Sequence, residues 1–498
     1  IKMYAMIAAV VASVLQMHAT SFGVVRHTPQ NMVPGMRNSP LSGSVLVAQA
    51  LRSGRYRLPF SYQPTLGELL TCTPAPCAVP NVRASEGGNP VNETPMAANP
   101  VKAAQMLSGG NDYNCPTTQG FFASKDGGAT WNHTCLGALA GSGGVGDPIV
   151  GYNTSGEAFI GGVDEVSGTV ANIAIEHSTN GGGTWSSPSL AVSGISPYTF
   201  CDKPWLQIDD GATSPRKDAM YISTTGFDPN SNSAMVVSHS TNGGSSFTSV
   251  MVDAVTYPEI DQFTDLGIGS DGTVYLSWMR CSATGPTSDC GGTKAAIYFS
   301  KSSDGGNTWT MPKQIAPANL TPDSCGAFYG CLPNTSERVS NVPPIDIDRS
   351  GGTFNNHIYV AYYNWTGAQM QVNVVNSADG GTTWSSPVRV THAANDEFFP
   401  WLTTNAKGFV GVTWLDRRLD PSNLSYDSFF AVSKNGGTHF APGQRLTTVS
   451  SNPDNDGFGG SFMGDYTGGI WVKLTDFASF TDTRSGVDGQ DEIGGWRL

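Results

Sequence analysis

The sequence predicts an all-β fold, a seven-bladed β-propeller built from four-stranded antiparallel blades. Three observations lead to this prediction: the composition, an eight-residue motif that recurs six times, and a second repeated unit that precedes the motif. The 498 residues include 60 Gly and 31 Pro, and only 13% are charged. This composition is typical of many short strands joined by turns rather than of long helices.

The recurrent motif has the form Ser-x-(Asp/Asn)-x-Gly-x-(Thr/Ser)-(Trp/Phe). Its first copy is residues 124–131, and the others begin at Ser178, Ser240, Ser302, Ser377 and Ser433, at intervals of 54 to 75 residues. Repeats of this length indicate propeller blades. The Asp or Asn can accept hydrogen bonds from the turn backbone, the Gly can adopt a positive φ, and the aromatic residue can pack beneath the turn. We therefore expect an Asp-box turn between the third and fourth strands of each blade, with a folding role and no catalytic one.

The unit upstream of the motif predicts the first two strands of a blade: a Pro-led strand, a polar turn with Gly, and a return strand that ends in an aromatic residue. Pro204-Trp-Leu206 and Pro400-Trp-Leu402 begin two such units. A seventh unit, from Gly464 to Arg484, has no motif after it. Residues 80–85 resemble a fourth strand, so we expect an N-terminal strand to complete the last blade and close the ring.

The chain divides into three predicted parts. Residues 1–20 carry Lys2 before an apolar run and predict a signal peptide; residues 21–79 form an N-terminal extension, partly irregular; and residues 80–498 form the propeller. No later apolar run is long enough to span a membrane. The net charge of −13 disfavours nucleic acid as a partner. We expect a secreted monomer, extracellular or periplasmic.

The spacing of the cysteines also favours an oxidising compartment. Four disulfides are expected from close pairs, which leaves Cys201 unpaired. The pairs are Cys72/Cys77, Cys115/Cys135, Cys281/Cys290 and Cys325/Cys331. The chain contains no Cys-x-x-Cys and no His-x-x-x-His spacing, so no structural zinc is predicted.

Charged residues gather where first strands start and second strands end, which is one face of a propeller, opposite the Asp-box turns. The first-strand starts carry Glu93, Asp147, Asp202, Lys203, Glu259, Asp261, Glu397, Asp465 and Tyr466, and the second-strand ends carry Arg280, Asp416, Arg417, Arg418, Asp482 and Arg484. Two interpretations stay open. The residues can be inter-blade salt bridges that fix the packing of the blades, or they can form a substrate site.

The substrate-site interpretation assigns roles to particular residues. Two carboxyl groups would do acid/base or nucleophilic work on a glycosidic bond, with Tyr466 as a candidate nucleophile, and arginines from separate blades would bind a substrate carboxylate. The predicted catalytic residues are Asp147, Asp202, Glu397, Asp465 and Tyr466. The predicted substrate-binding residues are Arg280, Arg417, Arg418, Arg484, Lys203, Trp205 and Trp401.

These motifs resemble those of the secreted BNR-repeat, sialidase-like proteins, from about Asn92 to the C-terminus. The resemblance is carried by the six Asp boxes with Gly146-Asp-Pro148, Asp202-Lys-Pro-Trp205, Phe398-Phe-Pro-Trp401, Asp416-Arg-Arg418, Gly464-Asp-Tyr466 and Asp482-Thr-Arg484. It implies a propeller of the sialidase superfamily, whose characterised members cleave terminal sialic acids with an arginine triad, a tyrosine with a glutamate partner, and an aspartate acid. The arginines named above come from the geometry of the rim and not from correspondence with that triad.

Three functions follow as hypotheses. The first is a secreted sialidase-like glycoside hydrolase acting on acidic glycans, an exo-α-sialidase in its most specific form. The second is a non-catalytic propeller that binds glycans or proteins. The third is a polysaccharide lyase that uses Tyr466 or Lys203 beside a neutralised uronate.

No cofactor is required by any of these functions, and no metal-ligating residue is predicted. Ca²⁺ is considered at two places. Residues 452–457 imitate the first half of a calcium loop, but Met463 stands where the bidentate Glu belongs, so an Asx-rich turn is favoured. Asp346 and Asp348 form the second place, at the turn after an inner strand.

Overall fold

The computed structural model describes residues 32–58, 72–285, 287–484 and 489–498. The predicted signal peptide, residues 1–20, lies outside the described residues. The described chain is built of short antiparallel strands, with one α-helix, α1 (Gly43–Arg52), and one 3-10 turn, η2 (Pro453–Asn455). The all-β prediction is therefore confirmed.

The strands form repeated four-stranded antiparallel units, which are distributed over six sheets. The first three units contain β2 (Val91–Asn92), β3 (Met96–Ala98), β4 (Met106–Asp112), β5 (Gln119–Ser124) and β6 (Asn132–Cys135); β7 (Gly143–Tyr152), β8 (Ala158–Ser167), β9 (Val170–Ser178) and β10 (Ser189–Val192); and β11 (Phe200–Ile208), β12 (Met220–Phe227), β13 (Ser233–Ser240) and β14 (Thr248–Val255). A single parallel bridge, Phe200 to Ala171, joins the second and third units into one sheet.

The remaining units follow in chain order. They contain β15 (Glu259–Ile268), β16 (Val274–Ser282), β17 (Lys294–Ser302) and β18 (Lys313–Asn319); β19 (Ile345–Ile347), β20 (Ile358–Trp365), β21 (Met370–Ser377) and β22 (Val388–Arg389); β23 (Glu397–Thr404), β24 (Val410–Asp416), β25 (Asp427–Ser433) and β26 (Gln444–Arg445); and β27 (Gly468–Val472), β28 (Thr475–Asp482) and β29 (Gln490–Arg497) with β1 (Cys77–Arg83).

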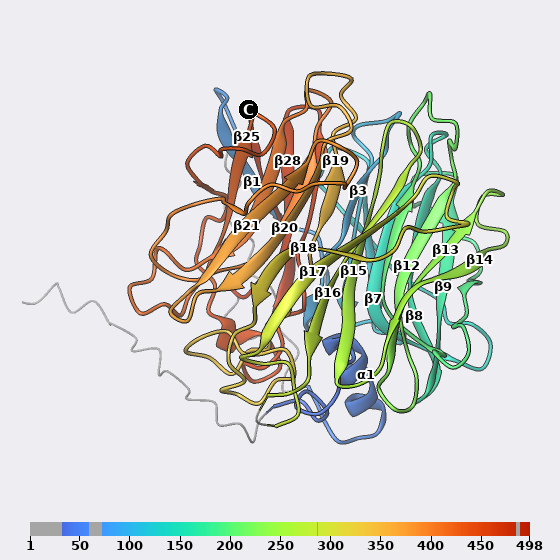
Figure 1. Ribbon diagram of the computed structural model, residues 1–498, viewed down its shortest axis with the longest axis vertical. Helices are drawn as coiled ribbons and strands as arrows, with labels where there is room; N and C mark the ends of the chain where they lie inside the picture. The colour runs from blue at the N-terminus through green and yellow to red at the C-terminus, as the bar shows by residue number, and fades with distance from the viewer. Residues whose placement is uncertain (1–31, 59–71, 286, 485–488) are drawn as a thin grey trace, which may run out of the picture.

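The innermost strands follow one another around a centre, which makes the arrangement propeller-like. Strand β3 contacts β7, and the contacts continue through β11, β15, β19, β23 and β27, which in turn contacts β3. Helix α1 lies at one end of these strands and contacts β7 (Figure 1).

An N-terminal strand completes the last unit, as expected from the pattern of residues 80–85. Strand β1 runs antiparallel to β29, with Cys77 opposite Arg497 and Arg83 opposite Glu492. The two ends of the described core are therefore hydrogen-bonded within one sheet, and the outer edge of β29 is covered.

The six copies of the motif form one kind of turn between a third and a fourth strand. In the first copy, Ser124 Oγ donates to Asp126 (2.9 Å) and accepts from the Gly128 N–H (2.9 Å), and the indole of Trp131 donates to the Gly128 carbonyl (3.1 Å). The same two serine hydrogen bonds recur in the other five copies. The motif therefore closes its turn with its own side chains, as the sequence indicates.

All four predicted disulfides are present, and Cys201 is a buried free thiol. Disulfides of this density are typical of extracellular proteins. Among the described residues, no helix has the length and apolar character needed to cross a membrane.

Candidate active site

The inner strands carry a bulge near their first residues. Pairing with the second strand shifts register after Asp202, after Gln262 and after Phe398. The backbone takes a left-handed conformation at Glu93, Asp147, Lys203, Phe263 and Phe399, with φ between 44° and 63°. Side chains other than Gly rarely adopt this conformation, and such residues concentrate at functional sites. The bulges gather charged side chains from several units at the end of the inner strands that α1 covers.

Six charged residues form what we call the central cluster, and none of their side chains is exposed to solvent. They are Glu93, Asp147, Asp202, Lys203, Arg338 and Asp465. Arg338 donates two hydrogen bonds to Asp465, from Nε to Oδ1 and from Nη2 to Oδ2, both 2.8 Å long. Four acids and two bases share this volume, so the cluster carries an excess of acidic groups in a region from which water is excluded.

The hydroxyl of Ser42 lies between Asp147 and Asp202. Its Oγ is 2.6 Å from Oδ2 of Asp147 and 2.7 Å from Oδ1 of Asp202. The Ser44 hydroxyl donates to the same oxygen of Asp147 (2.6 Å). A hydroxyl carries one proton, so both contacts of Ser42 are hydrogen bonds only when one of the two carboxyl groups is itself protonated.

Burial and mutual repulsion support that protonation. Burial, with the neighbouring Asp147, raises the pKa of Asp202 to about 7. Burial also raises the pKa of Asp147, against the pull of the nearby Lys203 ammonium. The pKa of Glu93 is raised well above its usual range by burial and by the charges of Asp147 and Asp465. Burial and mutual repulsion therefore favour a protonated carboxyl group in the cluster, and Lys203 lies next to Asp147.

Lys203 stands over aromatic rings instead of forming an ion pair. Its Nζ is 3.8 Å from the ring centroid of Tyr466 and 4.7 Å from that of Trp205, and it has no hydrogen-bond partner among the described residues. Burial lowers its pKa. The Tyr466 hydroxyl lies 3.4 Å from the Pro148 carbonyl, and burial beside acids raises the Tyr466 pKa, so its phenol stays protonated.

The two predicted tryptophans lie deeper, with ring centroids 4.6 Å apart. Trp205 and Trp401 also line a groove of about 140 Å³ together with Asp265, Asp346 and Arg349. That groove reaches Ile208, the last residue of β11, whereas Asp202 lies near the start of the same strand. Trp205 therefore borders both the groove and the central cluster, because its ring also lies 4.7 Å from Lys203 Nζ and 5.9 Å from the Tyr466 ring.

Three of the predicted arginines connect neighbouring units. Arg280 binds Asp261 of its own unit (2.6 Å) and Asp253 of the preceding one (2.5 Å). Arg418 pairs with Asp416 and reaches Thr391, and Arg484 pairs with Asp482 and reaches Thr448. These guanidinium groups lie at equivalent positions of three units and do not join the central cluster.

Glu397 and Arg417 also lie apart from the central cluster. The Glu397 carboxylate accepts from the Val372 N–H (3.1 Å), and burial raises its pKa to about 8. Arg417 is buried, donates to the Pro333 carbonyl (2.6 Å) and lies 3.6 Å from Asp396; burial lowers its pKa to about 10. Of the residues predicted from sequence, Asp147, Asp202, Lys203, Asp465 and Tyr466 come together.

Several residues of the site carry no signal in the sequence. Arg338 stands in the irregular connection between β18 and β19, and Ser42 and Ser44 stand in the extension whose role the sequence leaves open. Gln262 donates to Asp202 (2.8 Å) from an inner-strand position where the neighbouring units carry acids. Arg338 could have been found by one argument: an excess of acidic residues at the strand starts requires a cation, and that cation can come from outside the repeats.

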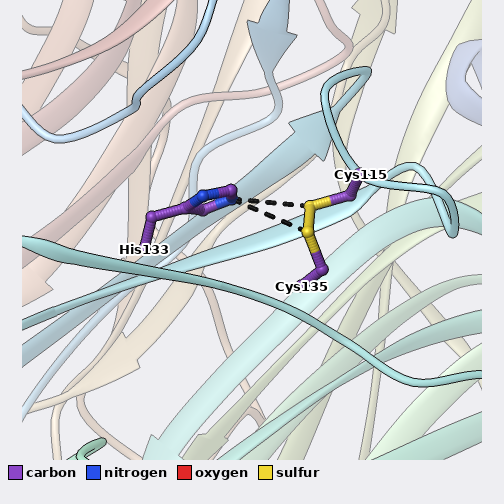
Figure 2. Close-up of side chains that lie close together, drawn as sticks. All are labelled: Cys115, His133 and Cys135. Carbon is purple, nitrogen blue, oxygen red and sulfur yellow. Dashed lines mark hydrogen bonds between the residues drawn. A yellow bond between two sulfur atoms is a disulfide. The ribbon is translucent and has the colours of Figure 1, made fainter.

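Figure 2 shows a group of potential metal ligands outside the cluster. His133 Nε2 lies 3.4 Å from Cys115 Sγ and 3.9 Å from Cys135 Sγ, and 2.9 Å from Asp112. Because the two sulfur atoms are bonded to each other, they offer no thiolate to a metal. The imidazole instead forms an ion pair with Asp112, which raises the His133 pKa.

In the two segments considered for Ca²⁺, the carboxylates accept hydrogen bonds from backbone N–H groups. Asp456 accepts from four N–H groups of its own loop, those of Phe458, Gly460, Ser461 and Phe462. Asp346 accepts from Ile347 and Thr404. The Asp456 arrangement is that of an Asx-rich turn, whereas Asp346 links its own strand to Thr404 of the next unit.

No family model and no curated protein matches the chain. Among solved structures, it is similar to an ulvan lyase of a new polysaccharide lyase family, with a TM-score of 0.50, 11% identity, and coverage of 81% of this chain and 93% of that one. It also matches an α-L-arabinanase of Penicillium chrysogenum (TM-score 0.45, 15% identity, 68% and 94% covered) and the leech intramolecular trans-sialidase (TM-score 0.44, 10% identity, 74% and 68% covered). At these identities the likeness is one of fold.

Proposed function

We propose that the chain is a secreted glycoside hydrolase on a seven-bladed ring, with its active site in the central cluster. The circle of contacts from β3 to β27 and back supports the ring. The four disulfides support secretion. The solved structures similar in fold include an arabinanase, a trans-sialidase and a polysaccharide lyase, all named for action on glycans.

The observation that carries the proposal is the pair Asp147 and Asp202 around a single hydroxyl oxygen. Ser42 Oγ is 2.6 Å from one oxygen of Asp147 and 2.7 Å from one oxygen of Asp202. The distance between these two oxygens therefore cannot exceed the sum of the two contacts. Retaining glycosidases hold their two carboxyl groups about 5–5.5 Å apart. A retaining mechanism needs one of the pair protonated and the other ionised, and the raised pKa of Asp202, about 7, supports Asp202 as the protonated partner.

The environment assigns one role to each carboxyl group. Asp202 is the general acid that protonates the leaving oxygen, because its proton is retained up to about pH 7. Asp147 takes the role of nucleophile, because the nearby Lys203 favours its ionised form against the effect of burial, which raises its pKa. Tyr466 fits the nucleophile role less well, because its raised pKa keeps the phenol neutral. Glu93 and Asp465 position the substrate beside this pair.

The substrate we propose is a neutral, hydroxyl-rich glycan in place of the acidic glycan of a sialidase. A sialidase needs guanidinium groups free to bind a carboxylate. Arg280, Arg418 and Arg484 are each engaged with a carboxylate of their own unit. Arg338 is engaged with Asp465.

A glycan-binding propeller without catalysis is the second candidate. The inter-unit contacts of Arg280, Arg418 and Arg484 favour it, because these residues then serve only to fix the blades. It predicts ligand binding with no product. A lyase would instead use Lys203 beside Tyr466 and would leave an unsaturated sugar end.

The test is release of a chromogenic aglycone from a panel of neutral aryl glycosides, uronides and sialosides by the full chain. We expect turnover of a neutral glycoside, and a loss of about 10²- to 10⁴-fold in kcat with Asp147→Asn or Asp202→Asn. Asp210→Asn is the matched control, because Asp210 lies in the groove at the other end of the inner strands. Turnover of sialosides alone would restore the acidic-glycan hypothesis.

A further inference from the structure

Residues 39–52, which we call the plug, cover the central cluster. They consist of an extended stretch and helix α1, and they lie at the end of the inner strands where the acids gather (Figure 1). Ser42, Gly43 and Ser44 are buried in spite of their position at the start of the helix. Substrate therefore cannot reach Asp147 or Asp202 in this arrangement.

The plug satisfies the acids of the cluster with donors. The Ser42 and Ser44 hydroxyls bind Asp147, the Ser42 N–H donates to Asp202 (2.7 Å), and the Gly43 N–H donates to Asp465 (2.9 Å). The first N–H groups of a helix have no partner within the helix and carry a partial positive charge, which adds to the attraction. All these groups come from three consecutive residues.

The plug also offers acceptors to the donors of the site. The Pro40 carbonyl accepts from Gln262 (3.1 Å) and from the Tyr329 hydroxyl (2.6 Å). The Leu41 carbonyl accepts from Arg338 (3.1 Å). A sugar ring presents the same groups. Its hydroxyls can donate to carboxylates, and its oxygens can accept from an arginine, an amide and a phenol.

The match between plug and cluster is incomplete. Lys203 Nζ, Asp147 Oδ1 and Glu93 Oε2 are fully buried and have no hydrogen-bond partner among the described residues. Buried polar groups without partners are rare and call for a ligand or water. The three atoms belong to the same cluster as the hydroxyl contacts of Ser42, so they indicate a ligand with more hydroxyl groups than the plug provides.

The plug is held by apolar contacts on two faces of α1 as well as by its polar groups. Val45 and Ala48 belong to the main hydrophobic core, and Arg52 pairs with Glu165 (3.0 Å). Leu46, Val47 and Ala50 pack with Phe458 and Phe462 in a cluster of their own. Gly43 sits so close to Phe462 that a Cβ there would lie 1.9 Å from the ring. The plug pairs with no strand of the sheets, so it can open as a local unit while their hydrogen bonds stay in place.

We propose that the plug is an intramolecular occupant of the active site, which mimics a hydroxyl-rich sugar and holds the full chain at low activity until it is displaced. The inference rests on the proposed function and names the regulation of that site. It also names the ligand class: a neutral sugar that donates two hydroxyls to Asp147 and Asp202 and places an oxygen acceptor beside Arg338.

Two substitutions displace the plug by different means. Ser42→Asp puts a third carboxylate between Asp147 and Asp202, and Gly43→Leu drives a side chain into Phe462. Ser53→Asp makes the same chemical change at the exposed far end of the helix and is the matched control. Hydrogen exchange of the α1 amides reports displacement independently of activity.

We expect both variants to raise kcat/KM for the neutral aryl glycoside at least tenfold over the full chain, and a synthetic peptide of residues 39–52 to reverse the gain. The same peptide with Ser42→Asp should not inhibit. Faster exchange in α1 without a gain in kcat/KM, or a wild-type peptide that does not inhibit, overturns the inference and leaves the proposed function standing. No turnover by any form, with cooperative unfolding and all four disulfides intact, overturns the proposed function and the inference with it.

Discussion

Arg338 and Asp465 form a bidentate ion pair in which neither side chain is exposed to solvent. The two residues are 127 positions apart, and the pair joins the irregular connection before β19 to the start of the last unit. Arg338 also donates to the Leu41 carbonyl, so the same guanidinium holds the plug. One side chain therefore couples three segments that no local pattern connects.

Removal of this arginine should destabilise the protein strongly. Arg338→Ala leaves Asp465 as a buried charge without its partner, and breaking a buried pair in this way costs about 3–5 kcal/mol. Chemical denaturation measures the loss. Arg349→Ala is the control, because the Arg349–Asp210 pair is about one-third exposed on each side and such pairs contribute about 1 kcal/mol or less. Equal losses in the two variants would contradict the assignment.

The serine of each Asp-box turn should contribute more to the free energy of unfolding than the residue that follows it. Ser302 is buried, donates to Asp304 (2.8 Å) and accepts from the Gly306 N–H (2.8 Å). Ser302→Ala leaves that N–H without its acceptor, at an expected loss of about 1–3 kcal/mol in the free energy of unfolding. Ser303→Ala, at the next and exposed position, should change it by less than about 0.5 kcal/mol. A similar loss for both would show that the turn does not depend on the serine hydroxyl.

The parts of the fold that could be predicted are those encoded locally. The turn at Ser302 is closed by residues within eight positions of one another, so its sequence is enough to find it. The strand at residues 80–85 could be paired with the last unit because it repeats the pattern of other fourth strands. Disulfides such as Cys325–Cys331 followed from close spacing.

The site was predicted only in its repeated part. Asp147, Asp202 and Asp465 stand at equivalent places of their units, which is why a periodic pattern finds them. Arg338 and Ser42 stand outside the repeats and meet the cluster across long separations, 160 residues in the contact of Ser42 with Asp202. Long-range contacts of this kind leave no periodic trace. The arginines at the ends of second strands do recur periodically, but they recur because they help to pack neighbouring units.

The lone thiol offers a simple check of the disulfide pattern. Cys201 is buried and burial raises its pKa to about 12, so the reactive thiolate is scarce at neutral pH. We expect no reaction with an aromatic disulfide reagent in the native protein and one equivalent of thiol after denaturation without reductant. Three or more equivalents would mean that at least one of the four disulfides is absent in solution.

The pH dependence of stability should reveal carboxyl groups that stay protonated in the fold. Burial raises the pKa of Asp491 to about 7, against hydrogen bonds from Ser108 and Ser479, whereas an unfolded Asp titrates near pH 4. The stabilising contribution is therefore complete below about pH 4 and is lost as pH rises toward 7, because only the unfolded chain releases the proton in that range. Each unit of pKa difference corresponds to about 1.4 kcal/mol.

Asp491→Asn removes this titration while it keeps a side chain of the same shape. The free energy of unfolding of the variant should therefore rise relative to that of the parent between pH 4 and pH 8. Asp304→Asn is the matched control with the opposite shift: its turn hydrogen bonds lower the Asp304 pKa to about 2, so its contribution is lost only as pH falls below 4. Over pH 4 to 8 that variant should differ from the parent by a constant amount. A constant difference for Asp491→Asn as well would mean that Asp491 is ionised in the folded protein, and that its two serine partners stabilise a buried carboxylate.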